Sequence, residues 1–248
     1  TAGTANANAS AVIRTSTTTE SGTYSFSNVP AGTYTIQASK DGYTSATSQS
    51  VTVESADVTD TNLTLSLIKY NVYVNGTQVT GLNKGNVLAS DTNNSGKVSY
   101  TPAGEGTPAK LTLSGVNLTS SGISTSEPLV IELQANTTNT ISVSGHAINM
   151  HQDTSSSKPA PLEITGTGTL NVTGSSQSST LYAYGDVTIN GGANVTAINT
   201  NTGLGDALDL TQHHLTISGD GTTLLAQKSG TAQGVAAINN VNTLTADG

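Results

Sequence analysis

The densest group of side chains capable of chemistry is a pair of aspartates followed closely by a pair of histidines. Asp206 and Asp209 precede His213 and His214 in the segment Gly-Asp-Ala-Leu-Asp-Leu-Thr-Gln-His-His, which begins at residue 205. Carboxylate oxygens are ligands that calcium prefers in proteins, so Asp206 and Asp209 are candidate calcium ligands. The alternative is a polar corner of the fold that binds nothing.

Two glutamates form a second candidate site. Glu132 and Glu163 occupy the same place in two similar segments, Ile-Glu-Leu and Leu-Glu-Ile. If the segments are neighbouring strands of one sheet, the two carboxylates lie about 4.8 Å apart on its outer surface. Like charges this close are unfavourable unless a cation or water screens them. We therefore expect either a calcium site at Glu132 and Glu163 or two glutamates that splay into solvent.

Two tyrosines form a third candidate. Tyr182 and Tyr184 are two residues apart in an alternating segment, so both side chains are expected to point outward from one face of a strand. Such a pair can stack on sugar rings, and we take both as candidate carbohydrate-binding residues. Ordinary packing against neighbouring loops is the alternative. We expect His146 and His151 to be loop residues rather than ligands.

The elements that would position these residues form an internal repeat. Its signature is apolar-x-apolar-x-Gly, followed seven to ten residues later by a second short strand and then by a third apolar patch. Copies begin at residues 111, 131, 162, 187 and 215, and the copy at 131 has Ala in place of Gly. Three short strands per repeat predict a right-handed parallel β-helix, in which stacked coils share a narrow apolar core.

We assign residues 68–248 to this β-helix. Residues 68–108 contain strands that do not follow the repeat, and we expect them to cap the first coil because the end of a solenoid must be covered. Residues 244–248 begin another coil, so we expect the chain to stop within a coil.

Residues 1–67 follow a different pattern. Seven of the nine aromatic residues lie in the first hundred positions, which indicates that two parts of the chain fill their cores differently. Alternating segments predict strands at residues 24–26, 34–36, 51–53 and 63–67. Several short strands at this spacing predict an antiparallel β-sandwich, so the whole chain is expected to be all-β.

Composition and charge limit the possible functions. The net charge is −8, and residues 101–248 carry three lysines against ten acidic residues. A nucleic-acid-binding protein needs a basic surface, which this chain lacks. No apolar stretch is long enough to insert into a bilayer. The chain has no cysteine, which excludes disulfides, thiolate metal sites and a catalytic thiol.

Enzymes that degrade polysaccharides also use β-helices. A lyase needs a strong base beside calcium-binding carboxylates, but the predicted β-helix has no arginine, and we place Lys110, Lys158 and Lys228 outside its repeat strands. A hydrolase needs two carboxylates about 5–10 Å apart in a cleft. Asp206 and Asp209 form the only dense pair, and a polar corner or a calcium site explains that pair better than catalysis. We therefore predict a protein that is not an enzyme.

One segment of the first part resembles a known family. The residues that carry the resemblance are the run Gly22-x-Tyr24-x-Phe26-x-x-Val29-Pro30-x-Gly32-x-Tyr34-x-Ile36, followed by Lys40-x-Gly42-Tyr43. This run resembles the carboxypeptidase-regulatory-like (transthyretin-like) sandwich over about residues 9–67, and the resemblance implies a spacer or stalk. The first strand of that family, before a strand at residues 11–13, is expected to be missing or degenerate here.

A second resemblance covers residues 109–230. It rests on Lys-Leu-Thr-Leu-Ser-Gly-Val-Asn-Leu-Thr-Ser-Ser from residue 110, Leu-Val-Ile-Glu-Leu from residue 129 and Asn-Thr-Ile-Ser-Val-Ser-Gly from residue 139. These segments resemble the β-helical carbohydrate-binding proteins of anaerobic Firmicutes. The resemblance implies an extracellular, cell-surface role in binding a polysaccharide or a host or bacterial surface component, with calcium as a candidate cofactor.

The leading hypothesis is therefore a non-catalytic bacterial surface protein, with a sandwich as spacer and a β-helix that binds polysaccharide or mediates adhesion. The first alternative is a purely structural stalk of a larger surface protein. The second is a fragment of a polysaccharide lyase or hydrolase whose active coil lies beyond residue 248.

Overall fold

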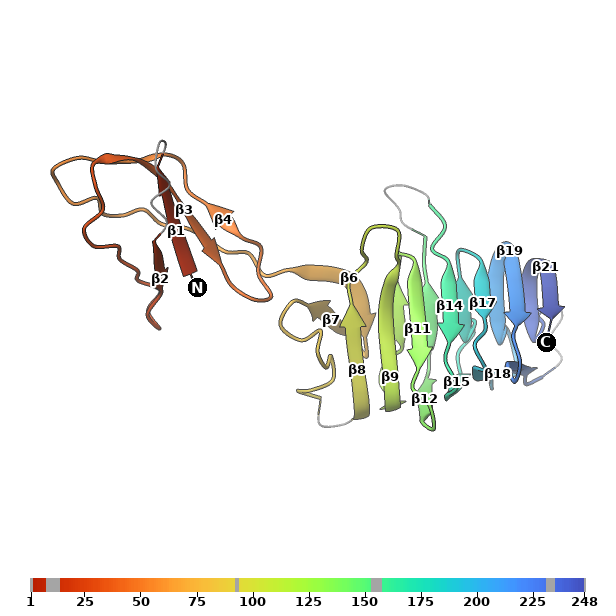
Figure 1. Ribbon diagram of the computed structural model, residues 1–248. Helices are drawn as coiled ribbons and strands as arrows, with labels where there is room; N and C mark the ends of the chain where they lie inside the picture. The colour runs from red at the N-terminus through yellow and green to blue at the C-terminus, as the bar shows by residue number, and fades with distance from the viewer. Residues whose placement is uncertain (1, 8–13, 92–93, 153–157, 231–234, 248) are drawn as a thin grey trace. The chain divides into compact units, whose positions relative to one another are not determined.

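The computed structural model describes residues 2–7, 14–91, 94–152, 158–230 and 235–247 (Figure 1). All regular structure within these residues is β-strand, so the predicted all-β class is confirmed. The chain divides into two compact units. The first comprises residues 1–69 and 80–82, and the second comprises residues 70–79 and 83–248.

The first unit is built on an antiparallel sheet around β3 (Gly32–Ser39). β3 pairs with β1 (Ala2–Ala7), β4 (Ala46–Thr47) and β5 (Val51–Val53), while β2 (Thr15–Thr17) pairs with β1. Alternation in β3 turns Tyr34, Ile36 and Ala38 to the buried side. The strands predicted at residues 34–36 and 51–53 are therefore present as β3 and β5.

Other expectations for the first unit are wrong. Residues 24–26 and 63–67 are not strands: Tyr24 donates its hydroxyl hydrogen bond to the carbonyl of Thr61, and Leu67 forms only an isolated bridge with Tyr43. Side-chain alternation predicts which way residues point, but a strand also needs a backbone partner. The strand expected to be missing is present as β1, which pairs with six residues of β3. The strand expected at residues 11–13 lies outside the described residues.

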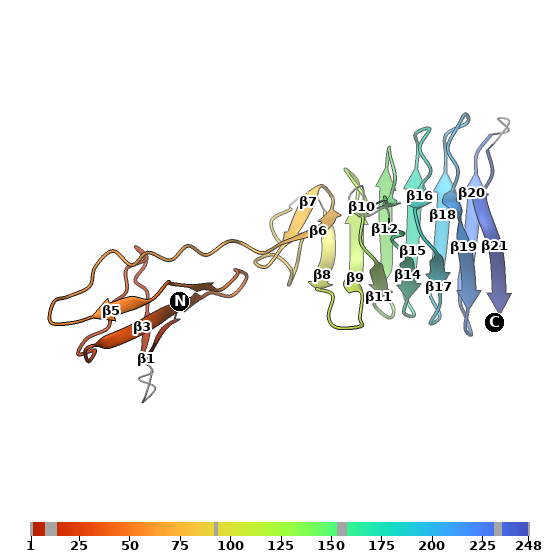
Figure 2. The same ribbon diagram turned by 90° about the horizontal axis from the view of Figure 1, so that it is seen from above.

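The second unit is a parallel β-helix of about four turns, as predicted (Figure 2). Its coils have three faces. Face 1 contains the end of β9 (Ala109–Leu118), β12 (Thr138–Val143), β15 (Thr169–Gly174), β18 (Asn194–Asn199) and β20 (Thr223–Lys228). Face 2 contains the start of β9, β11 (Leu129–Leu133), β14 (Leu162–Thr165), β17 (Val187–Ile189) and the ends of β19 (Leu208–Ser218) and β21 (Ile238–Asp247). Face 3 contains β10 (Ile123–Thr125), β13 (Ile148–Met150), β16 (Leu181–Ala183) and the starts of β19 and β21.

Three further strands lie at the first coil. β6 (Lys69–Val74) pairs antiparallel with β10 and extends face 3, while β8 (Ser95–Thr101) pairs antiparallel with β9; β7 (Thr77–Thr80) adds to β6. Val72, Val74, Val98 and Tyr100 from these strands are buried in the same core as the coils. Antiparallel strands thus cover the start of the parallel stack.

The core between the three faces is aliphatic and nearly free of aromatic rings. Fully buried side chains stack in columns along face 2. One such column consists of Leu111, Ile131, Ile164 and Ile189, one from each of four successive coils. Aliphatic side chains suit this space because each coil is thin and must share its apolar interior with its neighbours.

The register between the second and third coils differs from the prediction by two residues. Leu129 pairs with Leu162, so Ile131 lies beside Ile164 and not beside Leu162. Glu132 is therefore opposite Thr165, and Glu163 is opposite Val130, so the two glutamates do not share one position. A shift of two residues leaves every side chain on its predicted face, and so the apolar pattern cannot detect it.

Candidate functional site

A single row of outward side chains crosses face 3. The strands of this face lie side by side in the order β6, β10, β13, β16, β19 and β21. Each contributes one outward residue to the row, and that residue pairs with the one on the next strand. We call this set the tyrosine row; in order along the stack it consists of Tyr73, Ser124, Asn149, Tyr182, Asp209 and Asn239. Neighbouring members come from strands about 4.8 Å apart.

Two predicted residues, Tyr182 and Tyr184, lie on this face and are half-buried. Each ring contacts a histidine ring. The Tyr182 and His146 centroids are 5.4 Å apart, and the Tyr184 and His213 centroids are 5.5 Å apart. Gln152 donates a hydrogen bond from Nε2 to the Tyr184 hydroxyl at 3.0 Å. Both tyrosines are thus held by neighbours while each residue remains partly exposed to solvent.

The electrostatic surroundings keep Tyr182 neutral. Burial raises the pKa of its hydroxyl, and the negative charge of Asp209 and the neighbouring Tyr184 raise it further. A neutral phenol can both donate and accept a hydrogen bond, which suits it to contact with hydroxyl groups.

Several polar groups of the tyrosine row have no partner within the described residues. These are the hydroxyls of Tyr73, Ser124 and Tyr182, the side-chain amide of Asn149 and one carboxylate oxygen of Asp209. The other oxygen of Asp209, Oδ1, accepts from the Thr211 backbone N–H at 3.0 Å and from a neighbouring side-chain amide at 2.9 Å. The row thus offers donors and acceptors beside an aromatic ring.

The predicted cluster of Asp206, Asp209 and two histidines is divided in the structure. Asp206 is buried and accepts hydrogen bonds from the Ala236 backbone N–H at 2.7 Å and from Asn239 Nδ2 at 3.1 Å. Asp206 and Asp209 therefore tie their coil to the next one. Within the residues that the structure describes, no three His, Asp or Glu side chains are arranged to hold a metal ion.

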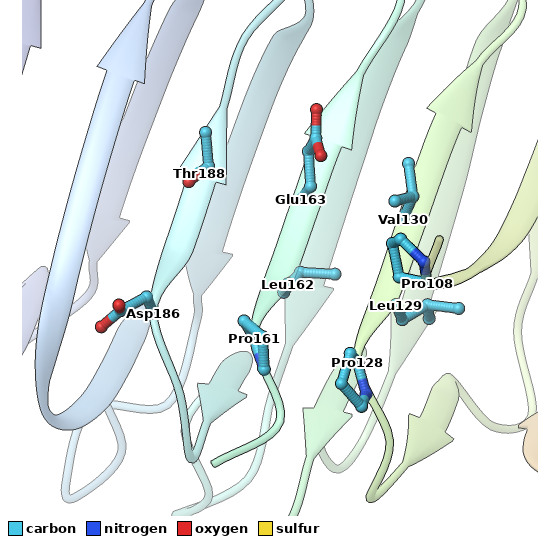
Figure 3. A pocket seen from close by; sticks show the side chains of 9 residues that line it. All are labelled: Pro108, Pro128, Leu129, Val130, Pro161, Leu162, Glu163, Asp186 and Thr188. Carbon is cyan, nitrogen blue, oxygen red and sulfur yellow. The ribbon is translucent and has the colours of Figure 1, made fainter. Parts of the chain in front are cut away.

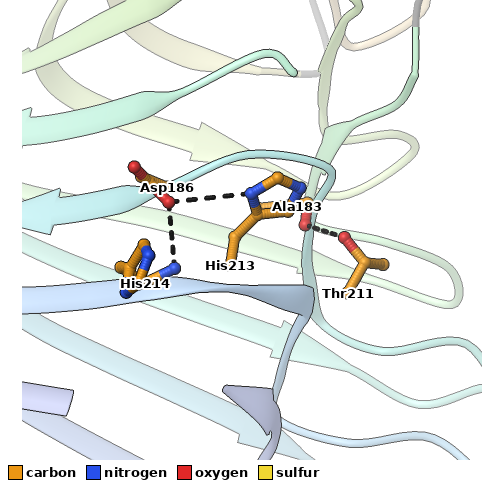
Figure 4. A network of polar contacts seen from close by, with 5 residues as sticks. All are labelled: Ala183, Asp186, Thr211, His213 and His214. Atoms are coloured by element: carbon orange, nitrogen blue, oxygen red, sulfur yellow. Dashed lines mark hydrogen bonds and ion pairs between the residues drawn. The ribbon is translucent and has the colours of Figure 1, made fainter. Parts of the chain in front are cut away.

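The His213 ring and the His214 backbone contact a different acid, Asp186. Its Oδ1 lies 3.6 Å from His213 Nδ1 and accepts the His214 backbone N–H at 2.9 Å (Figure 4). Asp186 thus fixes the bend at which β19 passes from face 3 to face 2. In the same bend, the Thr211 hydroxyl donates to the Ala183 carbonyl at 2.9 Å.

The two glutamates also have separate partners. Glu132 Oε2 lies 3.0 Å from Lys110 Nζ and accepts the Thr112 hydroxyl at 3.1 Å. Hydrogen bonding and the charge of Lys110 lower the pKa of Glu132. Glu163 Oε1 accepts from Asn190 Nδ2 at 2.9 Å.

The expectation that the lysines lie outside the repeat strands is wrong for two of the three. Lys110 is in β9 with an outward side chain, and Lys228 ends β20 at the position that pairs with the buried Asn199. A lysine at an outward position of a strand needs no change in the apolar pattern, so the pattern does not exclude it. Each has a partner within the described residues: Lys110 pairs with Glu132, and Lys228 Nζ donates to the Asn201 carbonyl.

A shallow hollow of about 160 Å³ lies at the start of the face 2 strands (Figure 3). Pro108, Pro128 and Pro161 each stand immediately before a strand and occupy one register position in successive coils. Glu163 and Asp186 border the hollow. It is smaller than the usual range for pockets that enclose a small molecule.

Comparison with known proteins agrees with both sequence resemblances. Residues 4–66 match the family model of the carboxypeptidase regulatory-like domain. Residues 75–245, more than half of the chain, match the model described as carbohydrate-binding domain-containing protein. The chain belongs to this family. Searches of curated proteins and of solved structures found no match. No helix that could cross a membrane occurs in the part of the chain that the structure describes.

In this carbohydrate-binding domain protein, some residues of the row escaped sequence analysis. The position of Asp209 beside Tyr182 depends on the pairing of β16 with β19, and Tyr73 joins the row only through the antiparallel pairing of β6 with β10. The outward direction of Tyr73 can be predicted from the sequence, because the apolar residues Val72 and Val74 flank it in an alternating pattern. Its position opposite Ser124 cannot be predicted in this way.

Proposed function

We propose that this protein binds a polysaccharide through face 3 of its β-helix. The observation that carries the proposal is the tyrosine row, where the part-exposed Tyr182 stands between Asn149 and Asp209. The side-chain amide of Asn149 and one oxygen of Asp209 have no partner among the residues that the structure describes. Aromatic rings provide a flat apolar surface, and a few placed polar groups fix the orientation of a ligand. Sugars present both an apolar C–H face and a rim of hydroxyls, which matches this arrangement.

We further propose that the protein acts outside the cell, at a bacterial cell surface, and that its ligand belongs to a host or bacterial surface. The first unit then serves as a spacer that carries the β-helix. The match to the carbohydrate-binding family and the Thr-, Ser- and Asn-rich coils support this proposal.

A non-catalytic role is part of the proposal. Asp206 has hydrogen-bond partners on both oxygens, and Glu132 is paired with Lys110. Carboxylates that hold coils together in this way are poorly suited to act as the general acid and base of a hydrolase.

A purely structural stalk is the second candidate, and face 1 favours it. Its central outward row contains the small polar side chains of Asn117, Thr140, Asn171 and Thr196 and then the exposed Leu225, with no aromatic ring among them. A stalk needs no aromatic surface of this kind. The two candidates therefore differ in whether face 3 binds a glycan.

Affinity electrophoresis through a panel of soluble neutral and acidic polysaccharides tests the proposal. We expect the full chain to be retarded by at least one glycan and Tyr182→Ala to lose about three- to tenfold in affinity, the value of one aromatic contact. The control variant Tyr43→Ala removes a half-buried tyrosine from the first unit and should migrate like the parent chain. Migration unchanged by every glycan would leave the stalk as the better account.

A further inference from the structure

We infer that the ligand is an unbranched, neutral glycan chain that lies along the stacking direction of the coils and reaches Tyr73 as a second aromatic subsite. This inference rests on the proposed function and adds the orientation, length and charge class of the ligand. It also gives a binding role to Tyr73, which lies before the first residue of the matched carbohydrate-binding region.

The geometry of the tyrosine row carries the orientation. Tyr73 pairs with Ser124, Ser124 with Asn149, and Asn149 with Tyr182. Three steps between strands separate the two tyrosines by about 14 Å. A strand step is close to the length of one pyranose unit in an extended chain, so successive sugars can follow successive coils. A chain that stacks on both rings therefore needs about four units.

The residues between the tyrosines are suited to sugar hydroxyls. The side chains of Ser124 and Asn149 are part-exposed, and neither forms a hydrogen bond within the described residues. The adjacent outward position differs, because Asn71 donates from Nδ2 to the Ser126 hydroxyl at 2.6 Å and so occupies both groups. Free polar groups thus follow the line that joins the two rings.

Charge selects the class of glycan. Asp209 follows Tyr182 in the row, and the nearby bend carries Asp186. Lys110 lies on face 2, Lys228 ends a face 1 strand, and Lys69 lies four residues before Tyr73 on the outward side of β6, so none of the three belongs to the tyrosine row. A chain of uronic acids would meet repulsion from these acids, whereas neutral hydroxyls can donate hydrogen bonds to Asp209.

The same surface predicts how affinity depends on chain length. Isothermal titration with unbranched glucan, mannan and xylan oligosaccharides, from disaccharide to hexasaccharide, measures the dissociation constant at each length. For the ladder that binds, we expect affinity to rise up to about the tetrasaccharide and then to level off. Tyr73→Ala should lose about three- to tenfold for the tetrasaccharide and longer chains and nothing for the disaccharide. Tyr182→Ala should weaken binding at every length.

Two further variants guard against a folding defect. Tyr73→Phe keeps the ring and should keep the long-chain affinity, while Tyr73→Thr removes the ring but suits a strand and should behave like Tyr73→Ala. The chain-length profile of the parent protein stands even if a variant fails to fold.

The outcomes separate the two proposals. If no polysaccharide in the panel binds, the proposed function fails and this inference fails with it. If Tyr182→Ala weakens binding but affinity does not change beyond the disaccharide, or if Tyr73→Ala has the same effect at all lengths, only the inference is overturned. Retention by acidic glycans alone overturns the assigned charge class.

Discussion

Among single residues, the four acids predicted to bind calcium are already engaged within the chain. Glu132 pairs with Lys110, Glu163 accepts from Asn190, and Asp206 and Asp209 bond to the following coil. These acids have partners within the chain and need no calcium ion to neutralise them. We therefore expect a calcium chelator to leave both the melting temperature and the glycan retardation unchanged. Differential scanning calorimetry with chelator and with added calcium measures this. A rise in melting temperature with calcium would contradict the expectation and restore a calcium site.

A buried tyrosine should make stability depend on alkaline pH. Burial, and then the charges of Glu127 and Tyr70, raise the pKa of Tyr100 to about 12 from an ordinary value near 10. The raised pKa contributes to the stability of the folded state, and the whole contribution is present below about pH 10. It is lost as pH rises through about 12. Two pKa units correspond to about 2–3 kcal/mol.

Urea unfolding of the second unit at about pH 9 and about pH 11 tests that dependence. Tyr100→Phe should lose less stability over this interval than the parent chain, since it has no proton to release. Tyr73→Phe changes an outward tyrosine of the neighbouring strand β6 and should keep the parent's dependence. Equal losses in Tyr100→Phe and the parent would refute the role of Tyr100.

Sequence reasoning recovered part of the candidate site at this scale. The shared face of Tyr182 and Tyr184 follows from the alternation of side chains in a strand. The position of Asp209 beside Tyr182 does not, because the loops between coils vary in length and set the register between strands. Long-range pairing of this kind is fixed by packing of the whole stack and leaves no local signature.

For the strands and corners, the conformation of individual glycines is decisive. Gly115 lies within β9 where that strand passes from face 2 to face 1, Gly166 follows β14, and their φ angles are positive, 64° and 91°. A Cβ added to Gly166 would lie 2.3 Å from the Leu133 carbonyl oxygen, whereas one added to Gly115 would meet nothing within 4 Å. We expect Gly115→Ala to cost about 1 kcal/mol and Gly166→Ala at least about 3 kcal/mol. If chemical unfolding shows the same decrease in the free energy of unfolding for both variants, the corner at Gly166 can rearrange to accommodate a Cβ.

The same corner explains why the register was predicted incorrectly. Alignment by the glycine signature equates Gly166 with Gly115 and therefore Leu162 with Leu111. In the structure β11 has three buried side chains, Leu129, Ile131 and Leu133, and the Gly166 corner turns beside Leu133. The existence and the faces of the strands could be predicted because apolar residues alternate. Their relative shift could not, because steps of two residues preserve that alternation.

At the level of the whole molecule, the described residues contain two separate apolar interiors. The buried cluster of the β-helix includes no residue of the first unit, whose buried side chains are Tyr34, Ile36 and Ala38. Each coil of the second unit shares its core with its neighbours, so that unit is expected to unfold cooperatively. We therefore expect calorimetry to resolve two transitions, with the smaller enthalpy belonging to the first unit because enthalpy scales with the number of residues.

A core variant assigns the transitions. Ile131 is fully buried in face 2, so Ile131→Ala should cost about 2–5 kcal/mol and lower only the transition of the β-helix. The matched variant Ile36→Ala removes a buried isoleucine from β3 and should lower only the other transition. If either variant shifts both transitions together, the two interiors unfold as one. In that case the first unit would stabilise the glycan-binding coils, and a role limited to that of a spacer would have to be abandoned.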